Sequence, residues 1–446
     1  MRHFFLSLLF LISFTGIAFA KAIEANKQAN DFINAKKYKE AVLILNKQVS
    51  TKKFDNDTIL LLGIAYSRLG EYDKAILYLE QAIKHPQGND RVNLELGLAY
   101  YLQSEQDQNY KGFKKAKSYF ITVKNKKDIP RDTLQKIEYH LKKIEQREEY
   151  GYPKNWQINA SAGYMYDSNA NAGTTENTVL MFNLPFVLSE DAKETSDDAY
   201  KYSLGLNYAK TTDSNWQVFG NIGVAQTDYR NLNNFDLVSL YSSGGIKYKK
   251  KNIIYSLPIA VNRLTVGHQD SYYNHTYGFN PSIAIEIGRN MVFNNQFVLQ
   301  ERRYKTVKTR DGNNITYRPN FKYYINQNHF FGIGGNIGKD NAEDDINSNT
   351  AYGLSLEYYK LFFARVSLYI APYISKTNYK AKENAFDELR EDRMYSLSSS
   401  LTYQFKGRRG FKPSLSLNYS FTKNDSNLPL YAYKRQQIGL ELSAKY

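Results

Sequence analysis

Residues Gln437 to Tyr446 read QIGLELSAKY, and polar and apolar side chains alternate through the whole stretch. Successive side chains of a β-strand point to opposite faces, so this alternation predicts a strand with one apolar and one polar face. The apolar face carries every second residue, namely Ile438, Leu440, Leu442, Ala444 and Tyr446. A strand with two such unlike faces suits a wall between an apolar and an aqueous environment.

This segment resembles the closing strand and C-terminal assembly signal of bacterial outer-membrane β-barrels. The resemblance implies that Tyr446 belongs to a barrel-assembly signal. It also implies that the chain is exported, so a secretory signal is expected at the N-terminus.

The first twenty residues have the features of a cleaved secretory signal. Arg2 and His3 form a short polar start, Phe4 to Phe14 are mostly apolar, and Ala18-Phe19-Ala20 resembles a cleavage site. About ten apolar residues are too few for a membrane-spanning helix, which needs about 20. We therefore expect residues 1–20 to be removed and the mature chain to begin at Lys21. The chain has no Cys, which excludes disulfides and a lipid anchor on an N-terminal Cys.

Composition argues against a helical membrane protein. The mean hydropathy is −0.57, and no later stretch approaches 18 consecutive apolar residues. Transmembrane β-strands place apolar residues only at every second position, so neither mean hydropathy nor the length of apolar runs detects a barrel. The sequence has 39 Tyr and 25 Phe, and Tyr suits the membrane–water boundary. The net charge of +15 fits either a solvated Lys-rich surface or attraction to an anionic membrane surface. No nucleic-acid partner is expected, since no reader motif is present.

A helical repeat occupies residues 21–150. Gly63 and Gly97 lie 34 residues apart, within the near-copies LGIAY and LGLAY. An Ala follows each copy, Ala75 after the first and Ala116 after the second. A 34-residue period with this pattern resembles the tetratricopeptide repeat, a solenoid of paired helices. The glycines are expected to let paired helices approach closely. Residues 136–147 are expected to form a polar capping helix.

Such a solenoid presents a concave surface to a peptide or protein client. The residues expected to line it are Leu60, Ile64, Arg68, Leu94, Leu98 and Tyr101. The apolar members of this set fit equally well as packing between repeats. The sequence leaves both interpretations open.

From Trp156 onward the apolar period changes from 3.6 to 2. Fourteen alternating segments follow, an even number as expected for a bacterial barrel. The second face of these segments is small and polar, which favours a hydrated lumen over the core of a soluble sandwich. The predicted strands are 156–169, 199–211, 216–230, 235–249, 252–265, 272–289, 291–307, 314–326, 329–340, 349–360, 364–379, 393–406, 412–423 and 430–446.

Connection lengths indicate the orientation. Every second connection is short, whereas the others include the long stretches 170–198, 340–348, 380–392 and 423–428. Outer-membrane barrels have short periplasmic turns and long extracellular loops. This predicts that both ends of residues 151–446, and the repeat domain, lie in the periplasm of a Gram-negative bacterium.

The complete arrangement resembles the surface lipoprotein assembly modulator family. A signal peptide, a small tetratricopeptide domain and a fourteen-stranded barrel follow one another in that family. Its barrel typically opens with a Trp-led strand ending in a Tyr-Asp-Ser-Asn segment, matched here by Trp156 and by Tyr166, Asp167, Ser168 and Asn169. The resemblance implies delivery of client proteins across the outer membrane. The clients would be surface lipoproteins or secreted haem- or iron-acquisition proteins, with the repeats engaging the client and the barrel forming or gating the route.

The rim of the first strand poses a specific question. Asp167 and Asn169 could simply turn a loop and contact water, or Asp167 could face the lumen as part of a gate, bonded to Arg or Lys. Arg302 and Arg303 raise a related question, because neighbouring strand residues cannot both face a lumen. One of them is expected at the rim, or the strand is bulged.

Signs of catalysis are scarce. The six His residues show no metal-ligand spacing, and there is no Cys nucleophile or G-x-S-x-G motif. Only His268 and His275, in a loop with Asp270 and Ser271, resemble the rim sites of barrel proteases and phospholipases. We expect a monomer without enzyme activity, metal or cofactor, whose partners are the client, outer-membrane lipids and the barrel-assembly machinery. The alternatives are an exopolysaccharide export porin with a tetratricopeptide domain and a passive porin.

Overall fold

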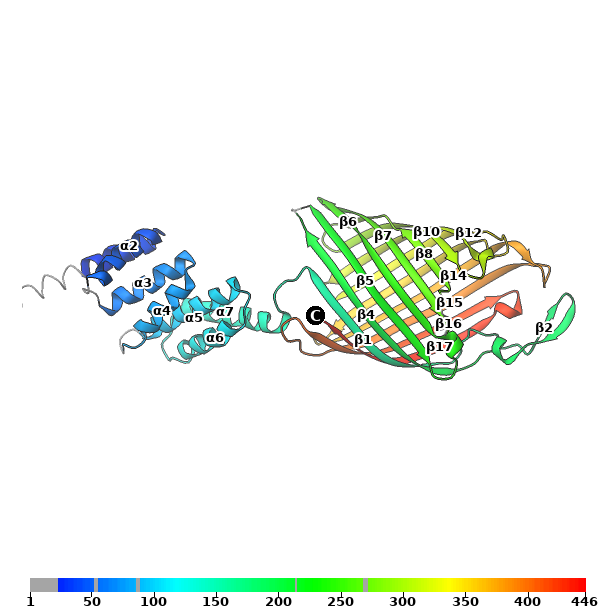
Figure 1. Cartoon of the computed structure of the whole chain (residues 1–446), viewed down its shortest axis with the longest axis horizontal. Helices are drawn as coiled ribbons and strands as arrows, with labels where there is room; N and C mark the ends of the chain where they lie inside the picture. The colour runs from blue at the N-terminus through cyan, green and yellow to red at the C-terminus, as the bar shows by residue number, and fades with distance from the viewer. Residues whose placement is uncertain (1–22, 52–54, 86–88, 213–214, 268–271) are drawn as a thin grey trace, which may run out of the picture. The chain divides into compact units, whose positions relative to one another are not determined.

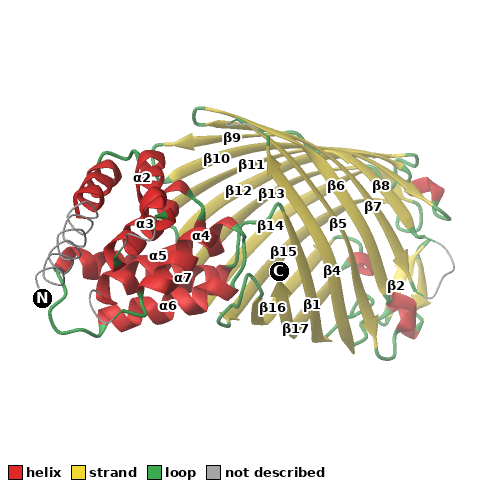
Figure 2. Cartoon of the chain, turned by 60° about the vertical axis from the view of Figure 1, so that its left-hand side comes forward, coloured by secondary structure: helices red, strands yellow, loops and turns green. Residues whose placement is uncertain are grey.

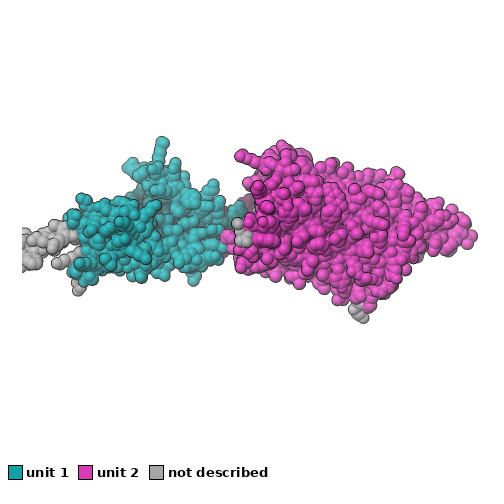
Figure 3. Space-filling view, turned by 90° about the horizontal axis from the view of Figure 1, so that it is seen from above, with its two compact units in different colours: residues 1–152 teal, residues 153–446 magenta. Residues whose placement is uncertain are grey.

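The computed structural model describes residues 23–51, 55–85, 89–212, 215–267 and 272–446. The chain forms two compact units, residues 1–152 and 153–446 (Figure 3). The predicted leader, residues 1–20, lies outside the described residues.

The first unit is built from helices that follow one another along the chain (Figure 1). Residues 23–34 are helical, and α3 contacts α4 as α5 contacts α6. Within the described residues, no helix combines the length and apolarity needed to cross a membrane. The later helices are α2 (Tyr38–Ser50), α3 (Asn56–Leu69), α4 (Tyr72–Ala82), α5 (Asn89–Gln106), α6 (Lys111–Lys124) and α7 (Arg131–Tyr150).

Close helix packing explains the repeated glycines. A Cβ on Gly63 would stand 2.7 Å from Leu79 Cγ, and one on Gly97 would stand 2.7 Å from Phe120 Cε1. Both distances are far below ordinary contact, so only Gly fits at either position. The expected close approach is confirmed. Leu79 and Phe120 are the side chains closest to these glycines, and the Ala75 carbonyl oxygen lies at the same contact as Leu79.

A second feature recurs with the same period. Tyr66 stacks on Tyr78 with ring centroids 5.6 Å apart, and Tyr100 stacks on Tyr119 at 5.9 Å. A Lys ammonium lies over each first ring, Lys74 over Tyr66 at 5.3 Å and Lys115 over Tyr100 at 4.6 Å. The two hairpins therefore repeat side-chain contacts, which is consistent with a tetratricopeptide-like solenoid.

The second unit is a closed antiparallel barrel (Figure 2). Each strand pairs with the next along the chain, and the first strand, β1, pairs with the last, β17. Fourteen strands form the wall when β8 and β9 are counted as one, as explained below. The strands are β1 (Trp156–Asp167), β4 (Asp197–Thr211), β5 (Trp216–Tyr229), β6 (Leu237–Lys250), β7 (Ile253–Val266), β8 (Asn274–Phe279), β9 (Ser282–Ile287), β10 (Met291–Tyr304), β11 (Gly312–Asn326), β12 (His329–Ala342), β13 (Asn349–Phe362), β14 (Val366–Glu383), β15 (Glu388–Gln404), β16 (Lys412–Ser426) and β17 (Tyr433–Lys445).

One predicted strand, 272–289, is interrupted by Pro281. The structure has β8 before this residue and β9 after it, because proline has no N–H for the strand ladder. Phe279 and Ser282 nevertheless keep one register against β7, opposite Ile259 and Ser256. The two pieces therefore act as one strand of the barrel wall.

Two predicted loops are wrong in detail. Residues 170–198 contain a small hairpin of β2 (Thr178–Met181) and β3 (Leu184–Val187), which the sequence interpretation missed because its strands are only four residues long. The predicted loop 380–392 is largely strand, since β14 and β15 extend to Glu383 and Glu388. Polar composition concealed this extension, because strands outside the membrane need no apolar face.

The apolar side chains of the barrel point outward, as the alternation predicts. Ile438, Leu440 and Leu442 are 49%, 54% and 57% exposed, whereas Gln437 and Glu441 face the lumen. Short turns connect the strands at the end that holds Trp156 and Tyr446. The longer connections, including residues 168–196, gather at the opposite end, called the loop-bearing end below.

Candidate gate at the loop-bearing end of the barrel

Asp167 ends β1 at the point where the barrel closes on itself. Its side chain is fully buried, with 0% of its surface exposed, and it faces inward beside Arg435 and Gln437 of β17. Tyr229, the last residue of β5, reaches the same point and is 5% exposed. We call Asp167, Tyr229, Arg435 and Gln437 the latch.

The other three members of the latch all donate hydrogen bonds to the Asp167 carboxylate. Arg435 donates from Nε at 3.0 Å to both oxygens and from Nη2 at 2.5 Å to Oδ2. The Tyr229 hydroxyl donates to Oδ2 at 3.0 Å and Gln437 Nε2 donates at 2.6 Å. A buried carboxylate is tolerated when it is paired and hydrogen-bonded in this way. The interpretation of Asp167 as a residue that contacts only water is wrong.

Residues 168–173 strap the following loop to β17. Asn169 is fully buried and donates from Nδ2 to the carbonyl of Lys434 at 2.9 Å and to that of Gly173 at 2.8 Å. Ser168 exchanges bonds with the backbone of Gln436 at 2.8 and 2.9 Å. A Cβ on Gly173 would lie 2.3 Å from the carbonyl oxygen of Lys193, so a side chain cannot be accommodated there. Asn169 is therefore a structural part of the closure as well.

The same end of the barrel holds all the buried carboxylates of the described residues. Arg302 pairs with Asp340, and Arg390 binds Asp392 through bonds of 2.6 and 3.1 Å. Backbone N–H groups satisfy the remaining two: Asn231 and Leu232 donate to Asp197 at 2.7 and 2.8 Å, and Tyr304 donates to Asp311. The exposed fractions are 0% for Asp167, 6% for Asp197, 6% for Asp311, 9% for Asp340 and 7% for Asp392. Buried carboxylates with Arg or backbone N–H partners thus stabilise the loop-bearing end, whereas the described residues of the short-turn end include none.

Arg302 and Arg303 point to opposite sides of β10. Arg302 faces inward to Asp340, and Arg303 faces outward, where it bonds to Glu301 from Nε at 2.7 Å. β10 pairs with β11 without a bulge over this stretch. Both residues lie near the rim, so of the two expected solutions the rim position is correct.

Loops reach over this mouth. The Arg390 guanidinium lies 3.5 Å from the ring centroid of Tyr431, in the connection between β16 and β17. Tyr431 also interacts electrostatically with Arg310, in the connection between β10 and β11 on a distant part of the wall. Burial raises the pKa of Tyr431. Connections from well-separated strands therefore meet at the loop-bearing end.

At the short-turn end the same pair of strands is joined by rings. Trp156 and Tyr446 have ring centroids 5.8 Å apart. The Lys154 ammonium lies 4.5 Å from the Trp156 ring and 3.4 Å from the Tyr446 ring. Backbone bonds of 2.9 Å run both ways between Ile158 and Tyr446. Tyr166, the other aromatic of the motif, is 44% exposed on the outer face.

A cavity of about 390 Å³ lies inside the barrel against the seam between β1 and β17. Gly163 of β1 and Gly439 of β17 are among its lining residues, together with Lys201, Ser398 and Glu441. The seam therefore borders polar space in the lumen between its two fastened ends.

The structure separates the six residues expected on a concave client surface. Leu60, Ile64 and Tyr101 are 6%, 3% and 9% exposed and belong to the helical core, where Tyr101 contacts the rings of Phe113 and His140. For these three the packing interpretation fits, because side chains filled on all sides offer no surface. Leu94 and Leu98 are partly buried, and Arg68 pairs with Glu95 at 3.1 Å.

The His residues within the described part of the chain show no assembled site. His268, Asp270 and Ser271 lie outside the described residues. His275 stacks on Tyr272 with centroids 3.9 Å apart. Burial lowers the pKa of His140 in the helical unit, where Phe120 stacks on it at 5.5 Å.

Residues 156–446 match the family model described as surface lipoprotein assembly modifier. The chain belongs to this family. A surface lipoprotein assembly modifier with the barrel described here is an outer-membrane β-barrel protein, so the match gives both the compartment and the class of client. The motif from Trp156 to Asn169 lies within the matched region.

Several solved structures resemble the chain at low similarity. A FadL homologue of Pseudomonas aeruginosa is 8% identical with a TM-score of 0.37, covering 66% of this chain and 90% of that one. OmpT of Vibrio cholerae lacking loop L8 is 8% identical with a TM-score of 0.36, covering 66% and 100%. No curated protein sequence matches the chain. Likenesses at these TM-scores carry no conclusion about the chain.

Proposed function

We propose that this protein carries lipoproteins across the outer membrane to the cell surface. The helical unit receives the client in the periplasm, and the barrel gates the route. The observation that carries the proposal is the family match over the whole barrel, together with a buried carboxylate that fastens the first strand to the last at the loop-bearing end. Secreted haem- or iron-acquisition proteins are a second class of client for the same route.

The orientation follows from the strand connections. The turns beside Trp156 and Tyr446 are short, with β6 and β7 separated by two residues and β11 and β12 likewise. Because short turns face the periplasm in outer-membrane barrels, the helical unit belongs on that side. The latch and the strapped loop then face outward.

The latch is the gate of this proposal. Its charges are buried in the closed state, so they hold the mouth shut only while all partners stay together. A client that displaces Arg435 or the loop would expose Asp167 to water, where the carboxylate no longer needs its partner.

The remaining parts of the proposal concern partners. We propose that Arg68, Leu94 and Leu98 contribute to client contact, because they are the members of the expected set with accessible surface. The protein acts by binding and gating, without catalysis, metal or cofactor, and as a monomer. It reaches the outer membrane through the barrel-assembly machinery, with Tyr446 in the recognised segment.

Surface exposure of a client tests the proposal. A lipoprotein encoded beside this gene would be co-expressed with the intact chain or with an empty vector, and intact cells would be treated with protease. We expect loss of surface cleavage without the chain while the total lipoprotein level stays constant. Equal cleavage with and without the chain would refute the proposal, and loss of a surface polysaccharide instead would favour the export porin.

A variant of the latch tests the gate. Gln437→Ala removes one neutral donor from Asp167 but leaves the ion pair with Arg435 in place. We expect a higher single-channel conductance in planar bilayers. Ser420→Ala is the matched control, since it removes the partner of the other end of the Gln437 amide, 3.0 Å away, without touching Asp167.

A further inference from the structure

Basic side chains on the outside of the barrel lie at one depth. Lys339 of β12 pairs with Ile315, which is 53% exposed on the outer face. Arg393 of β15 lies two residues from outward Tyr395, and Lys434 of β17 lies four residues from outward Ile438. Since side chains alternate along a strand, all three face away from the lumen.

Their depth is set by their position along the strand. Lys339 is ten residues from the short-turn end of its strand at His329, while Arg393 and Lys434 are each eleven residues from Gln404 and Lys445. A tilted strand rises about 2.5 Å per residue along the barrel axis, so ten residues span about 25 Å. This is the height of the apolar band of an outer-membrane barrel, about 25 Å. The three cations therefore stand where the outer leaflet ends.

Other outward cations share this level. They are Arg263 of β7, Arg303 of β10, Lys376 of β14 and Lys423 of β16, each ten to twelve residues from the short-turn end. Arg263 lies 5.6 Å from the ring centroid of Tyr272. The other three are each paired with a neighbouring acid, Glu301, Glu391 or Asp425, at 2.5 to 2.9 Å. By contrast, Lys339, Arg393 and Lys434 form no ion pair or hydrogen bond through their side chains in the part of the chain that the structure describes. We call these three the basic rim.

On the opposite side of the barrel, β1, β5 and β6 carry uncharged outward residues at this level. Outward positions at the same level are Tyr166 on β1, Gln226 on β5 and Val238 on β6. Just beyond them the outward residues are acidic, Asp198 on β4 and Asp228 on β5. The three cations of the basic rim thus all lie on β12 to β17, whereas Arg263 on β7 and Arg303 on β10 contact a ring or an acid.

We propose that the basic rim binds the phosphate groups of a phosphorylated lipid in the outer leaflet, of the lipid A type. The inference rests on the orientation given under the proposed function, which places this rim outside. An unpaired cation just beyond an apolar band meets acyl chains below it and phosphate beside it, and both contacts are favourable. Lys434 also belongs to the strapped seam, because its carbonyl accepts the Asn169 bond, so bound lipid would lie beside the latch.

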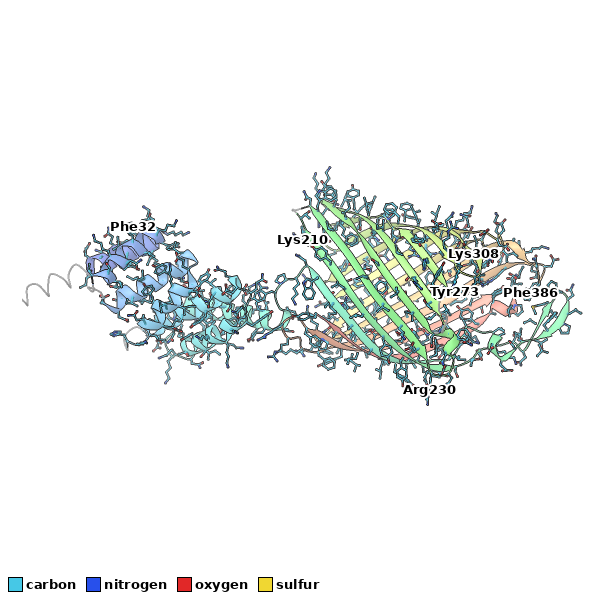
Figure 4. All side chains as sticks on the ribbon, in the orientation of Figure 1. Phe32, Lys210, Arg230, Tyr273, Lys308 and Phe386 are labelled. Carbon is cyan, nitrogen blue, oxygen red and sulfur yellow. The ribbon has the colours of Figure 1, made fainter. Side chains whose placement is uncertain are left out.

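Binding of defined lipids to the purified full-length protein in detergent tests this. The probes are lipid A with both phosphates, lipid A from which the phosphates have been removed, and inorganic phosphate. The variant is Lys339→Gln with Arg393→Gln and Lys434→Gln. The control is Lys210→Gln with Lys250→Gln and Lys360→Gln, which removes three cations from outward positions at the short-turn ends of β4, β6 and β13, where Figure 4 shows Lys210.

We expect the rim variant to bind phosphorylated lipid A about a hundredfold more weakly than the unchanged protein. The control variant is expected to keep the binding of the unchanged protein, and dephosphorylated lipid A is expected to bind weakly. Equal binding of dephosphorylated lipid A, an equal loss in the control, or displacement by inorganic phosphate at the same concentration would each overturn the proposal. Lys339→Gln alone, with about a fivefold loss, serves if the triple variant fails to fold. Client exposure is measured separately, so a failure of lipid binding leaves the translocation proposal standing and the reverse also holds.

Discussion

The two ends of one seam are closed by different chemistry. At the loop-bearing end, β1 and β17 are joined by Asp167, which is buried from water, and Arg435, whose side chain is 27% exposed, and both bond to Tyr229. At the short-turn end the same two strands are joined by the half-exposed rings of Trp156 and Tyr446, with Lys154 above them. A buried charge pair is rigid and fails abruptly when one partner is lost, whereas partly exposed rings weaken gradually. This contrast predicts that the seam opens at the loop-bearing end and stays joined at the short-turn end.

A disulfide across the seam should have the largest effect. The chain lacks Cys, and Ser161 of β1 faces Ser443 of β17 on the lumen side. Ile158 and Tyr446 exchange hydrogen bonds, so by alternation Ser161 and Ser443 form a close non-bonded pair, with Cα atoms about 4.5 Å apart. In Ser161→Cys with Ser443→Cys, oxidation should abolish client exposure and reductant should restore it. The matched control is Ser203→Cys with Ala225→Cys, which locks β4 to β5 instead. Equal loss in the control would show that strand separation at the seam is not required.

Arg435→Ala should be the most destabilising single change. It leaves the Asp167 carboxylate buried without a cation, at a cost of about 3–5 kcal/mol. The measurement is urea unfolding of the protein in detergent, followed by the shift of the folded band on gels. Arg303→Ala removes an Arg with 56% side-chain exposure and should cost less than about 1 kcal/mol. Similar losses in both variants would contradict the distinction between buried and exposed pairs.

Trp156→Ala should have an intermediate effect at the other end. It removes one ring pair and one cation–π contact, together worth about 1–2.5 kcal/mol. The same unfolding measurement applies. Tyr446→Phe keeps the ring and should change stability by only a few tenths of a kcal/mol, about the value for a surface hydroxyl. A loss as large as that of Arg435→Ala would mean that the two ends are equally critical.

Lys154→Ala should have the smallest effect. Its ammonium interacts with two partly exposed rings, which predicts a loss of about 0.5–1 kcal/mol. Lys154→Arg should retain most of the stability, because a guanidinium also stacks on aromatic faces. An unchanged unfolding curve for the Ala variant would show that the rings alone fasten this end.

Much of the fold could be predicted from the sequence because it depends on local periodicity. Alternation along a strand is a property of neighbouring residues, so outward Leu440 and inward Glu441 are visible in the sequence. The same holds for Gly63 and Gly97, which recur at the repeat length. Pro281 and the four-residue strands β2 and β3 were missed because a single proline or a very short alternation carries little periodic signal.

The candidate site was only partly accessible. Asp167 and Asn169 stood out through their motif, but the partners Tyr229 and Arg435 did not. Tyr229 is one of 39 Tyr, and Arg435 one inward residue among many. In the helical unit, Leu60 and Ile64 have the spacing of a surface stripe, and only packing against neighbouring helices shows that they are buried.

The sequence by itself determined the two periods, the number of strands and the face to which each side chain points, because these follow from backbone geometry over a few residues. Only the tertiary structure decided that Asp167 meets Arg435, 268 residues away. The physical reason is closure: a barrel brings its first and last strands together with a stagger set by the whole wall, and no local pattern contains that stagger.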